Sequence, residues 1–145
     1  MIKRFNKSVE ELLLKAGWFE GRQWSGLSQV IGPDVPDAAR CILAEFGWLR
    51  MGKVGPGLEH ATSDLDLDPT KGDSIADSAE LQQWCKANEK TVFPLGEAHR
   101  GQGVLLVDES GNIYLYGEGL FLVARNFDDA LEVLLMGHHT HELQL

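Results

Sequence analysis

The chain has 145 residues and a mass of 16.0 kDa, and its 43% hydrophobic and 24% charged side chains are typical of one soluble globular domain. A chain of this size removes roughly 70% of its unfolded surface from water on folding, so the core needs no disulfide, metal or cofactor to hold it together. The 13 Lys and Arg residues against 22 Asp and Glu residues leave a net charge of −9, which disfavours a nucleic-acid partner and favours basic proteins.

The N-terminus and the cysteines indicate a cytoplasmic protein. Residues 1–5 already carry charge, and no apolar run approaches the roughly 18 residues of a membrane span. Cys41 and Cys85 lie far apart and form no CxxC pair, which is typical of reduced, partly buried thiols. We therefore expect neither export nor a membrane partner.

Two helices are predicted before residue 48. Ser8 followed by Glu11 forms a capping box, and apolar residues then recur at helical spacing until Gly17. After two prolines a second helix is predicted to end at Gly47. Its apolar stripe comprises Val35, Ala38, Ala39, Ile42, Leu43 and Phe46. Residues 23–30 have too short and mixed a pattern to assign.

The centre of the chain predicts a hairpin, a helix and a strand. Residues 48–67 alternate apolar and polar side chains around the turn at 55–57. Asp77 with Glu80 predicts the start of a third helix that ends near Asn88. A strand over 91–95 follows.

The last third predicts a three-stranded meander and a closing helix. Residues 104–107, 112–116 and 120–124 are rich in β-branched, aromatic and leucine side chains, and turn residues join them. Asn126 then caps a helix that ends at Gly137. This order of elements predicts an α+β fold, with one domain over residues 1–145, a mostly antiparallel sheet packed against helices, and a frayed tail from about residue 138.

Three aspartates at alternate positions raise the possibility of a metal site. Asp64, Asp66 and Asp68 would project from one face of a strand and could hold a hard cation such as calcium. A comparison with the EF-hand loop fails, because Pro69 and Ile75 stand where that loop needs glycine and glutamate. The alternative is a solvated polar face.

The charge count supports another interpretation of the same segment. Residues 59–80 hold seven acids against Lys71 as the one base. A concentrated surface of one sign steers a partner of the opposite sign, so the segment is a candidate docking surface, with a solvated face as the alternative. The candidate partner-binding acids are Glu59, Asp64, Asp66, Asp68, Asp73, Asp77 and Glu80.

Other polar clusters give no catalytic signature. His138, His139 and His141 with Glu142 could chelate a transition metal, but a short tail lacks the rigidity that metal ligands need, so we predict no metal site. Glu97 and His99 could form an acid and base pair, yet no Ser, Cys or third orienting residue stands at a recognisable spacing.

Several short motifs resemble one family in the same order along the chain. The run 14–22, LKAGWFEGR, resembles the AGW-x-x-GR opening of one branch of the SUKH superfamily, the immunity proteins related to the yeast Smi and Knr cell-wall regulators. Further likenesses are the helix end AEFG at 44–47, the strand FPLGE at 93–97, the hairpin VDESGNIY at 107–114 and the closing helix at 126–131. The resemblance covers residues 12–137. Its motif residues are Gly17, Trp18, Gly21, Arg22, Gly96, Glu97, Asp108, Gly111 and Tyr114.

This resemblance implies a function in bacterial competition. It implies an α+β domain without enzymatic activity that binds and neutralises the C-terminal domain of a cognate polymorphic toxin, often a nuclease. The negative net charge agrees independently, because a nuclease is basic where it holds phosphates. A regulatory or scaffold domain of the same fold that binds an unrelated partner is the second hypothesis, and a hydrolase or metal-dependent enzyme ranks last.

The motif residues are expected to be structural. Arg22 and Glu97 are lone charges in glycine-rich and apolar motifs, so we predict a partly buried ion pair between them that joins the first turn to the sheet.

Overall fold

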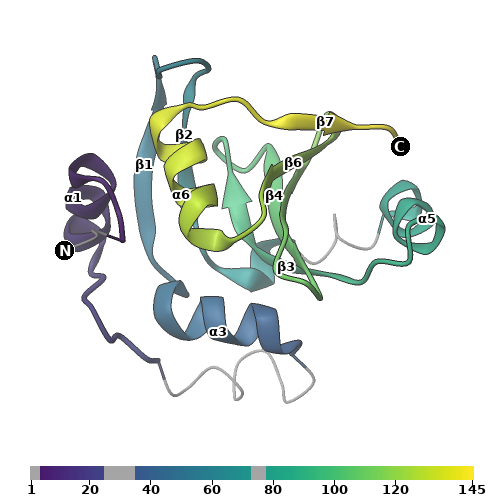
Figure 1. Cartoon of the computed structure of the whole chain (residues 1–145), viewed down its shortest axis with the longest axis horizontal. Helices are drawn as coiled ribbons and strands as arrows, with labels where there is room; N and C mark the ends of the chain where they lie inside the picture. Colours follow the sequence, from purple (N-terminus) through teal and green to yellow (C-terminus); the bar gives the residue numbers. More distant parts are fainter. Residues whose placement is uncertain (1–3, 25–34, 73–77) are drawn as a thin grey trace.

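The computed structural model describes residues 4–24, 35–72 and 78–145. The described part holds four α-helices, a short 3-10 helix and a seven-stranded sheet, which confirms the α+β class and the single domain (Figure 1). The helices are α1 Lys7–Ala16, α3 Asp37–Phe46, the 3-10 helix η1 Pro69–Gly72, α5 Ala79–Ala87 and α6 Phe127–Met136. The strands are β1 Arg50–Gly55, β2 Thr62–Asp66, β3 Val92–Ala98, β4 Gly103–Asp108, β5 Ile113–Tyr116, β6 Leu120–Ala124 and β7 His141–Leu143.

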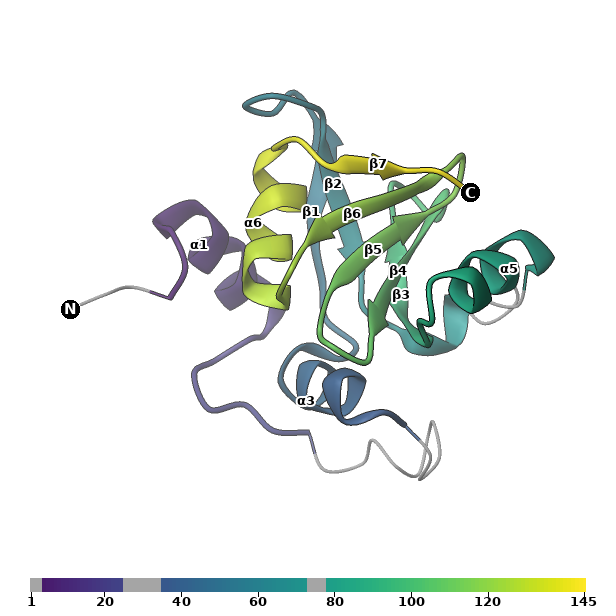
Figure 2. The same ribbon diagram turned by 45° about the vertical axis from the view of Figure 1, so that its right-hand side comes forward.

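The sheet is an antiparallel meander whose spatial order follows the sequence from β1 to β7. Helices α1, α3 and α6 pack against one face, and α5 covers part of the other (Figure 2). Strand β4 is buried along its whole length because both of its faces are covered: Val104 and Leu106 pack with α5, and Leu105 and Val107 pack with the larger core. None of the helices in the described residues is long and apolar enough to cross a bilayer.

Helix α1 begins earlier than the capping box predicted. Asn6, not Ser8, is the N-cap, and its side-chain oxygen accepts a hydrogen bond of 2.9 Å from the Val9 amide. Asparagine caps as well as serine does, and Asn6 is in the extended conformation that a cap requires. The predicted end is confirmed, because Gly17 takes the left-handed conformation at φ 111°.

Helices α3 and α5 also begin with other residues than predicted. Helix α3 starts at Asp37, and Val35 is buried just outside it. The cap of α5 is Ser78, whose hydroxyl accepts from the Leu81 amide and bonds the Tyr116 hydroxyl at 2.9 Å. Asp77, the predicted cap, lies outside the described residues.

The predicted strands and the closing helix are confirmed, and β3 is longer than expected. It continues to Ala98 through an irregular register between Pro94 and Gly96. Asn126 caps α6 with a bond of 2.8 Å from the Asp129 amide, and Gly137 ends it.

The C-terminal residues form a strand, so the prediction of a frayed tail from residue 138 is wrong. Strand β7 pairs with β6, with Leu143 opposite Leu120 and Glu142 opposite Phe121. Without β7 the edge of β6 would be unpaired, and pairing satisfies its backbone groups.

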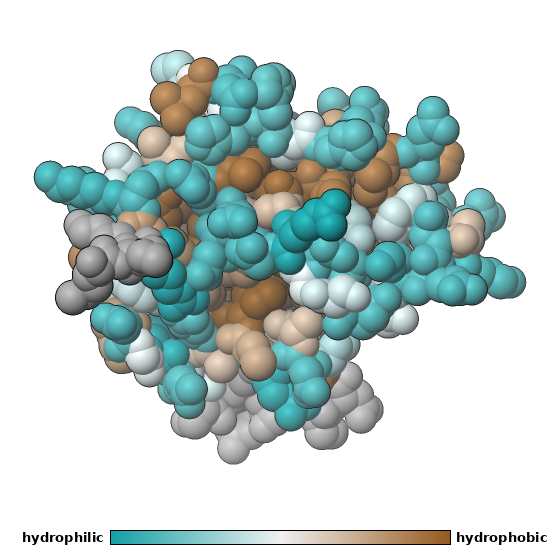
Figure 3. Space-filling model, in the orientation of Figure 1, coloured by the Kyte–Doolittle hydropathy of each residue, from teal (hydrophilic) through white to brown (hydrophobic). Residues whose placement is uncertain are grey.

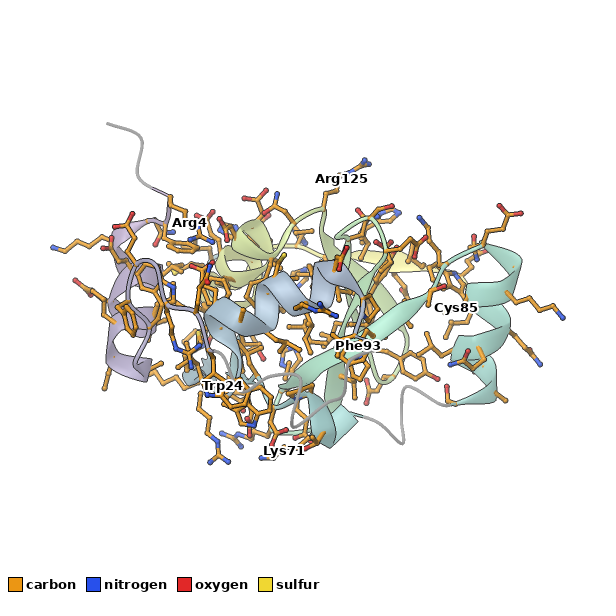
Figure 4. All side chains as sticks on the ribbon, turned by 90° about the horizontal axis from the view of Figure 1, so that it is seen from below. Arg4, Trp24, Lys71, Cys85, Phe93 and Arg125 are labelled. Atoms are coloured by element: carbon orange, nitrogen blue, oxygen red, sulfur yellow. The ribbon has the colours of Figure 1, made fainter. Side chains whose placement is uncertain are left out.

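The two cysteines are free and differ in burial. Cys85 lies on the side of α5 that faces the sheet, and this burial raises the pKa of its thiol (Figure 4). Cys41 is exposed, so the expectation of partly buried thiols fails for it.

Candidate protein-binding site

A cavity of about 390 Å³ opens between α6, the loop that joins β1 to β2, and the strands β4 to β6. Its apolar walls are Leu115, Phe121, Val133 and Leu134. Figure 3 shows apolar side chains at the surface between α6 and β7, with hydrophilic side chains around them. Polar groups lie on the same walls: His60, His99, Gln102, Glu118, His138 and Thr140. An apolar interior with a few polar groups is the usual composition of a binding pocket.

One wall of this cavity is fixed by bonds between the β1–β2 loop and the end of α6. The amides of Leu58, Glu59 and His60 donate to the carbonyls of Met136 and Gly137 at 2.7–2.9 Å. The last carbonyls of a helix have no partner within it, so the loop acts as the C-terminal cap of α6. The loop and helix thereby form one continuous rim.

Side chains strengthen the same junction. Glu59 accepts from His138 Nδ1 at 3.1 Å and from the His139 amide at 3.3 Å, and the rings of His60 and His139 are joined by a bond of 2.5 Å. The hydrogen bond from His138, followed by that from the His139 amide, lowers the pKa of Glu59, which keeps it ionised. The three C-terminal histidines therefore do not act as a group: His138 and His139 bind Glu59, and His141 lies on β7.

One carboxylate, that of Glu118, lines the cavity, and two more lie next to lining residues. Glu118 is part of the lining and is exposed, and Glu59 holds His138 at the rim. Glu142 pairs directly with Phe121 across β6 and β7, which places both side chains on the same face of the sheet. No lysine or arginine of the described residues lines the cavity. The cavity is therefore suited to a positively charged group.

A second groove, along α1 and the edge strand β1, has mixed charge. Lys15, Arg50 and Lys53 line it together with Asp64 and Asp66. The opposite charges leave no preference for either sign of partner.

Asp64 and Asp66 share the outward face of β2, whereas Asp68 lies after the end of the strand, and each of the three has a partner within the protein. Ser63, Leu65 and Leu67 point into the protein, and Asp64, Asp66 and Asp68 are all half-buried on the other side. Asp64 accepts from the Arg100 amide at 2.8 Å, and Asp68 accepts from the amide and hydroxyl of Thr70 at the start of η1. Asp66 pairs with Lys71 at 2.5 Å and with Arg50 at 3.3 Å.

The remaining acids of the predicted docking surface are spread over the molecule. Glu59 lies on the β1–β2 loop and Glu80 in the first turn of α5, and Figures 1 and 2 both place these elements at different ends of the molecule. Asp73 and Asp77 lie outside the described residues. Charges that are close along the chain are thus not gathered into one patch within the described part.

The other candidate metal and catalytic groups do not converge. Among the described residues, no three His, Cys, Asp or Glu side chains are placed to hold a metal ion. His99 lines the cavity, whereas the Glu97 carboxylate lies against the turn at Gly101.

The first motif ties the end of α1 to the end of α3. Trp18 is buried, and its indole Nε1 donates to the Glu45 carboxylate at 3.0 Å. The Arg22 guanidinium donates to the carbonyls of Glu45 at 2.6 Å and Gly47 at 3.0 Å. Arg22 therefore binds the negative end of a helix, and the predicted ion pair with Glu97 is wrong.

Sequence reasoning missed Arg4, which joins three parts of the chain (Figure 4). Its guanidinium binds Glu45 at 2.6 Å and Asp128 at 2.7 Å and lies over the rings of Phe5 and Phe46. The hydrogen bonds to Asp128 and Glu45 raise the pKa of Arg4. No local pattern marks an arginine whose partners are on α3 and α6.

The later motifs hold the turns of the sheet. In the β4–β5 hairpin, Gly111 takes a left-handed conformation at φ 93°, and the Asp108 carboxylate accepts from Asn112 and Tyr114. Gly96 on β3 lies so close to the backbone of Asp66 that a side chain could not fit. Gly21 at φ 83° continues the turn after Trp18. None of the motif residues lines the cavity, so within this structure they support the scaffold.

The antiparallel meander, the helices on both faces and the ordered motifs define a small α+β domain of the SUKH superfamily. The family model of the SUKH-3 immunity protein matches residues 5–137, and the chain therefore belongs to the SUKH-3 immunity protein family. Searches of curated proteins and of solved structures found no significant match.

Proposed function

We propose that this protein binds a cognate toxin domain and neutralises it by covering the toxin's active or substrate-binding surface. The observation that carries the proposal is the match to the SUKH-3 immunity protein family over residues 5–137. Neutralisation by coverage requires a complementary surface and no catalytic group in the immunity protein, so the proposed activity is binding alone.

The net charge narrows the class of partner. A chain with a net charge of −9 associates fastest with a basic domain. Nuclease domains are basic where they hold phosphates, so a nuclease is the toxin class that the charge favours. The cytoplasm, where such a toxin would act on nucleic acid, is the compartment in which we expect the complex to form.

The contact surface in this proposal includes the acids of the β1–β2 loop and of β2. Asp64 and Asp66 face outward from β2, Asp68 follows the strand, and Glu59 lies on the loop before it. Of the other predicted acids, Glu80 lies at a different end of the molecule and is left out of this surface, and Asp73 and Asp77 lie outside the described residues. Because Asp66 is paired with Arg50 and Lys71, the contribution of β2 is long-range steering more than direct pairing.

Co-expression tests the proposal. The C-terminal domain of the polypeptide encoded immediately upstream is expressed in a bacterial host with and without this protein, and survival and co-purification are scored. Rescue of growth together with a stoichiometric complex that dissociates at high salt is the expected result.

Continued toxicity with this protein soluble and folded would overturn the pairing. The alternative of a regulatory or scaffold domain of the same fold would then take its place. A rescue without any complex would contradict neutralisation by coverage.

A further inference from the structure

We propose that the cavity beside α6 receives a lysine or arginine side chain of the toxin domain. The inference rests on the proposed function and adds to it the place and the chemistry of the central contact. The cavity differs from the acids of β2, because its one carboxylate, Glu118, lies beside an apolar hollow and has no lysine or arginine partner among the described residues.

The shape and lining of the cavity suit a long side chain with a charged end. The four apolar walls can cover the methylene stem of lysine or arginine, which buries readily while the charged group stays among polar atoms. A volume of about 390 Å³ is ample for one such side chain together with a few waters. The lining includes Glu118, which is exposed and has no bond to another described residue.

The charge around the cavity has one sign. Glu118 lines it, Glu59 is at the rim and stays ionised through its bonds to His138 and His139, and Glu142 faces the same side of the sheet as Phe121. An apolar side chain of the partner would take water from the Glu118 carboxylate and offer it no donor in return, which is unfavourable. A cation with donor groups satisfies the carboxylate.

The rim supplies the surface that shields such a contact from water. Leu58, at the tip of the β1–β2 loop, is 67% exposed, and it adjoins His60 and Ala61 of the lining. The loop is held in place by its bonds to the end of α6, so Leu58 is presented on a fixed support. A buried polar contact ringed by apolar side chains is the usual arrangement at the energetic centre of an interface.

Two variants test the cavity without touching the core. Ala61→Trp fills the mouth from an exposed lining position, and Glu118→Lys reverses the charge inside. The matched controls are Ala87→Trp and Glu89→Lys at the end of α5, where both residues are exposed. The affinity of each purified variant for the upstream-encoded toxin domain is measured by calorimetry, and folding is checked by urea unfolding.

We expect both cavity variants to weaken binding by at least tenfold and both controls to leave it within twofold. Each lysine and arginine of the toxin domain is then replaced by methionine, which keeps the stem and removes the charge. One of these toxin variants should bind the wild-type protein more weakly than the unchanged toxin domain does. The same toxin variant should bind Glu118→Gln as tightly as the unchanged toxin domain binds Glu118→Gln.

The outcomes separate the two proposals. If the wild-type protein binds and rescues growth while Ala61→Trp and Glu118→Lys bind as tightly as it does, the cavity proposal is overturned and the proposed function stands. If no basic residue of the toxin couples to Glu118, the occupant is not a cation and the proposal is equally wrong. A wild-type protein that does not bind would overturn both.

Discussion

The Tyr114 hydroxyl donates a hydrogen bond of 2.7 Å to Oδ2 of Asp108, and both side chains are buried. The same carboxylate accepts from the amides of Ser110 and Asn112 and from the Asn112 side chain, and Lys90 lies 3.6 Å away. Burial by itself would raise the pKa of Asp108, but these hydrogen bonds outweigh it and hold the pKa below its ordinary value. The hairpin motif of this chain is thus a buried carboxylate with a full set of donors.

Truncation of Asp108 is expected to be costly. Asp108→Ala leaves the buried hydroxyl of Tyr114 and the turn amides without an acceptor, so we expect a loss of about 3–5 kcal/mol in the free energy of unfolding. Tyr114→Phe removes one donor to a charged group and should cost about 1.5–3 kcal/mol. Urea unfolding of both single variants and the double variant measures these values. If the two losses simply add, the bond contributes no coupling and our account of the hairpin is wrong.

The same carboxylate predicts a pH dependence. The pKa of Asp108 is lower in the folded protein than the value of about 3.9 in an unfolded chain. Its contribution to stability is therefore complete above about pH 4 and is lost as the pH falls through the lower, folded value. The free energy of unfolding of the wild type should fall more steeply below pH 4 than that of Asp108→Asn. Glu89→Gln, at an exposed site, should keep the wild-type slope, and equal slopes for all three proteins would contradict the prediction.

Arg22 gives a second test of the scaffold. Its guanidinium bonds the carbonyls of Glu45 and Gly47, a fork geometry that lysine cannot reproduce. We expect Arg22→Ala to cost about 1.5–3 kcal/mol and Arg22→Lys to recover only part of that loss. Because Glu97 is not its partner, the losses of Arg22→Ala and Glu97→Ala should add in the double variant. A measurable coupling between them in urea unfolding would restore the ion pair that the sequence suggested.

Alanine substitutions at two glycines distinguish the effect of a close backbone contact from the effect of backbone strain. An alanine Cβ at Gly96 would collide with the backbone of Asp66 on the neighbouring strand, whereas at Gly111 it would meet nothing within 4 Å. Both residues have positive φ, so both alanine variants carry strain of about 1–2 kcal/mol, and the Gly96 variant adds the cost of displacing β2. Thermal and urea unfolding should therefore rank Gly96→Ala well below Gly111→Ala in stability. If Gly111→Ala were the less stable variant, the close approach of Gly96 on β3 to the backbone of β2 would be contradicted.

Local signals in the sequence account for most of the fold. The Asn126 cap, the glycines that end α1 and α6, and the runs of β-branched, aromatic and leucine residues in β4 to β6 depend on neighbours within a few residues, and these were predicted. Strand β7 was not, because three residues with no strong pattern pair only in response to the open edge of β6. The cap of α1 was misplaced because Asn6 and Ser8 are both good capping residues.

The candidate site is less visible in the sequence, for a related reason. The cavity is assembled from the β1–β2 loop, the β3–β4 turn, β5, β6, α6 and the residues that follow it, and no one segment carries a recognisable motif. Glu59 was singled out for its place in an acidic run, but its contacts with His138 and His139 come from residues far along the chain. Conversely, the run of acids in the sequence predicted a larger acidic patch than the structure forms. The sequence does not show that Arg50 of β1 and Lys71 of η1 pair with Asp66.

Charge reversal on β2 tests electrostatic steering of the toxin. The triple variant with Asp64, Asp66 and Asp68 changed to Lys should bind the toxin domain with an on-rate about tenfold slower at low salt, because the long-range attraction is reduced. The difference should shrink at high ionic strength, where the Debye length falls to a few ångströms, and the off-rate should change little.

A matched triple variant with Glu11, Glu20 and Glu89 changed to Lys alters the net charge equally at exposed sites elsewhere. Stopped-flow association at several salt concentrations measures both, with urea unfolding to verify the fold, since Asp66 and Asp68 have local partners. If the two triple variants slow association equally, steering comes from net charge alone, and if neither does, the acidic strand has no part in docking.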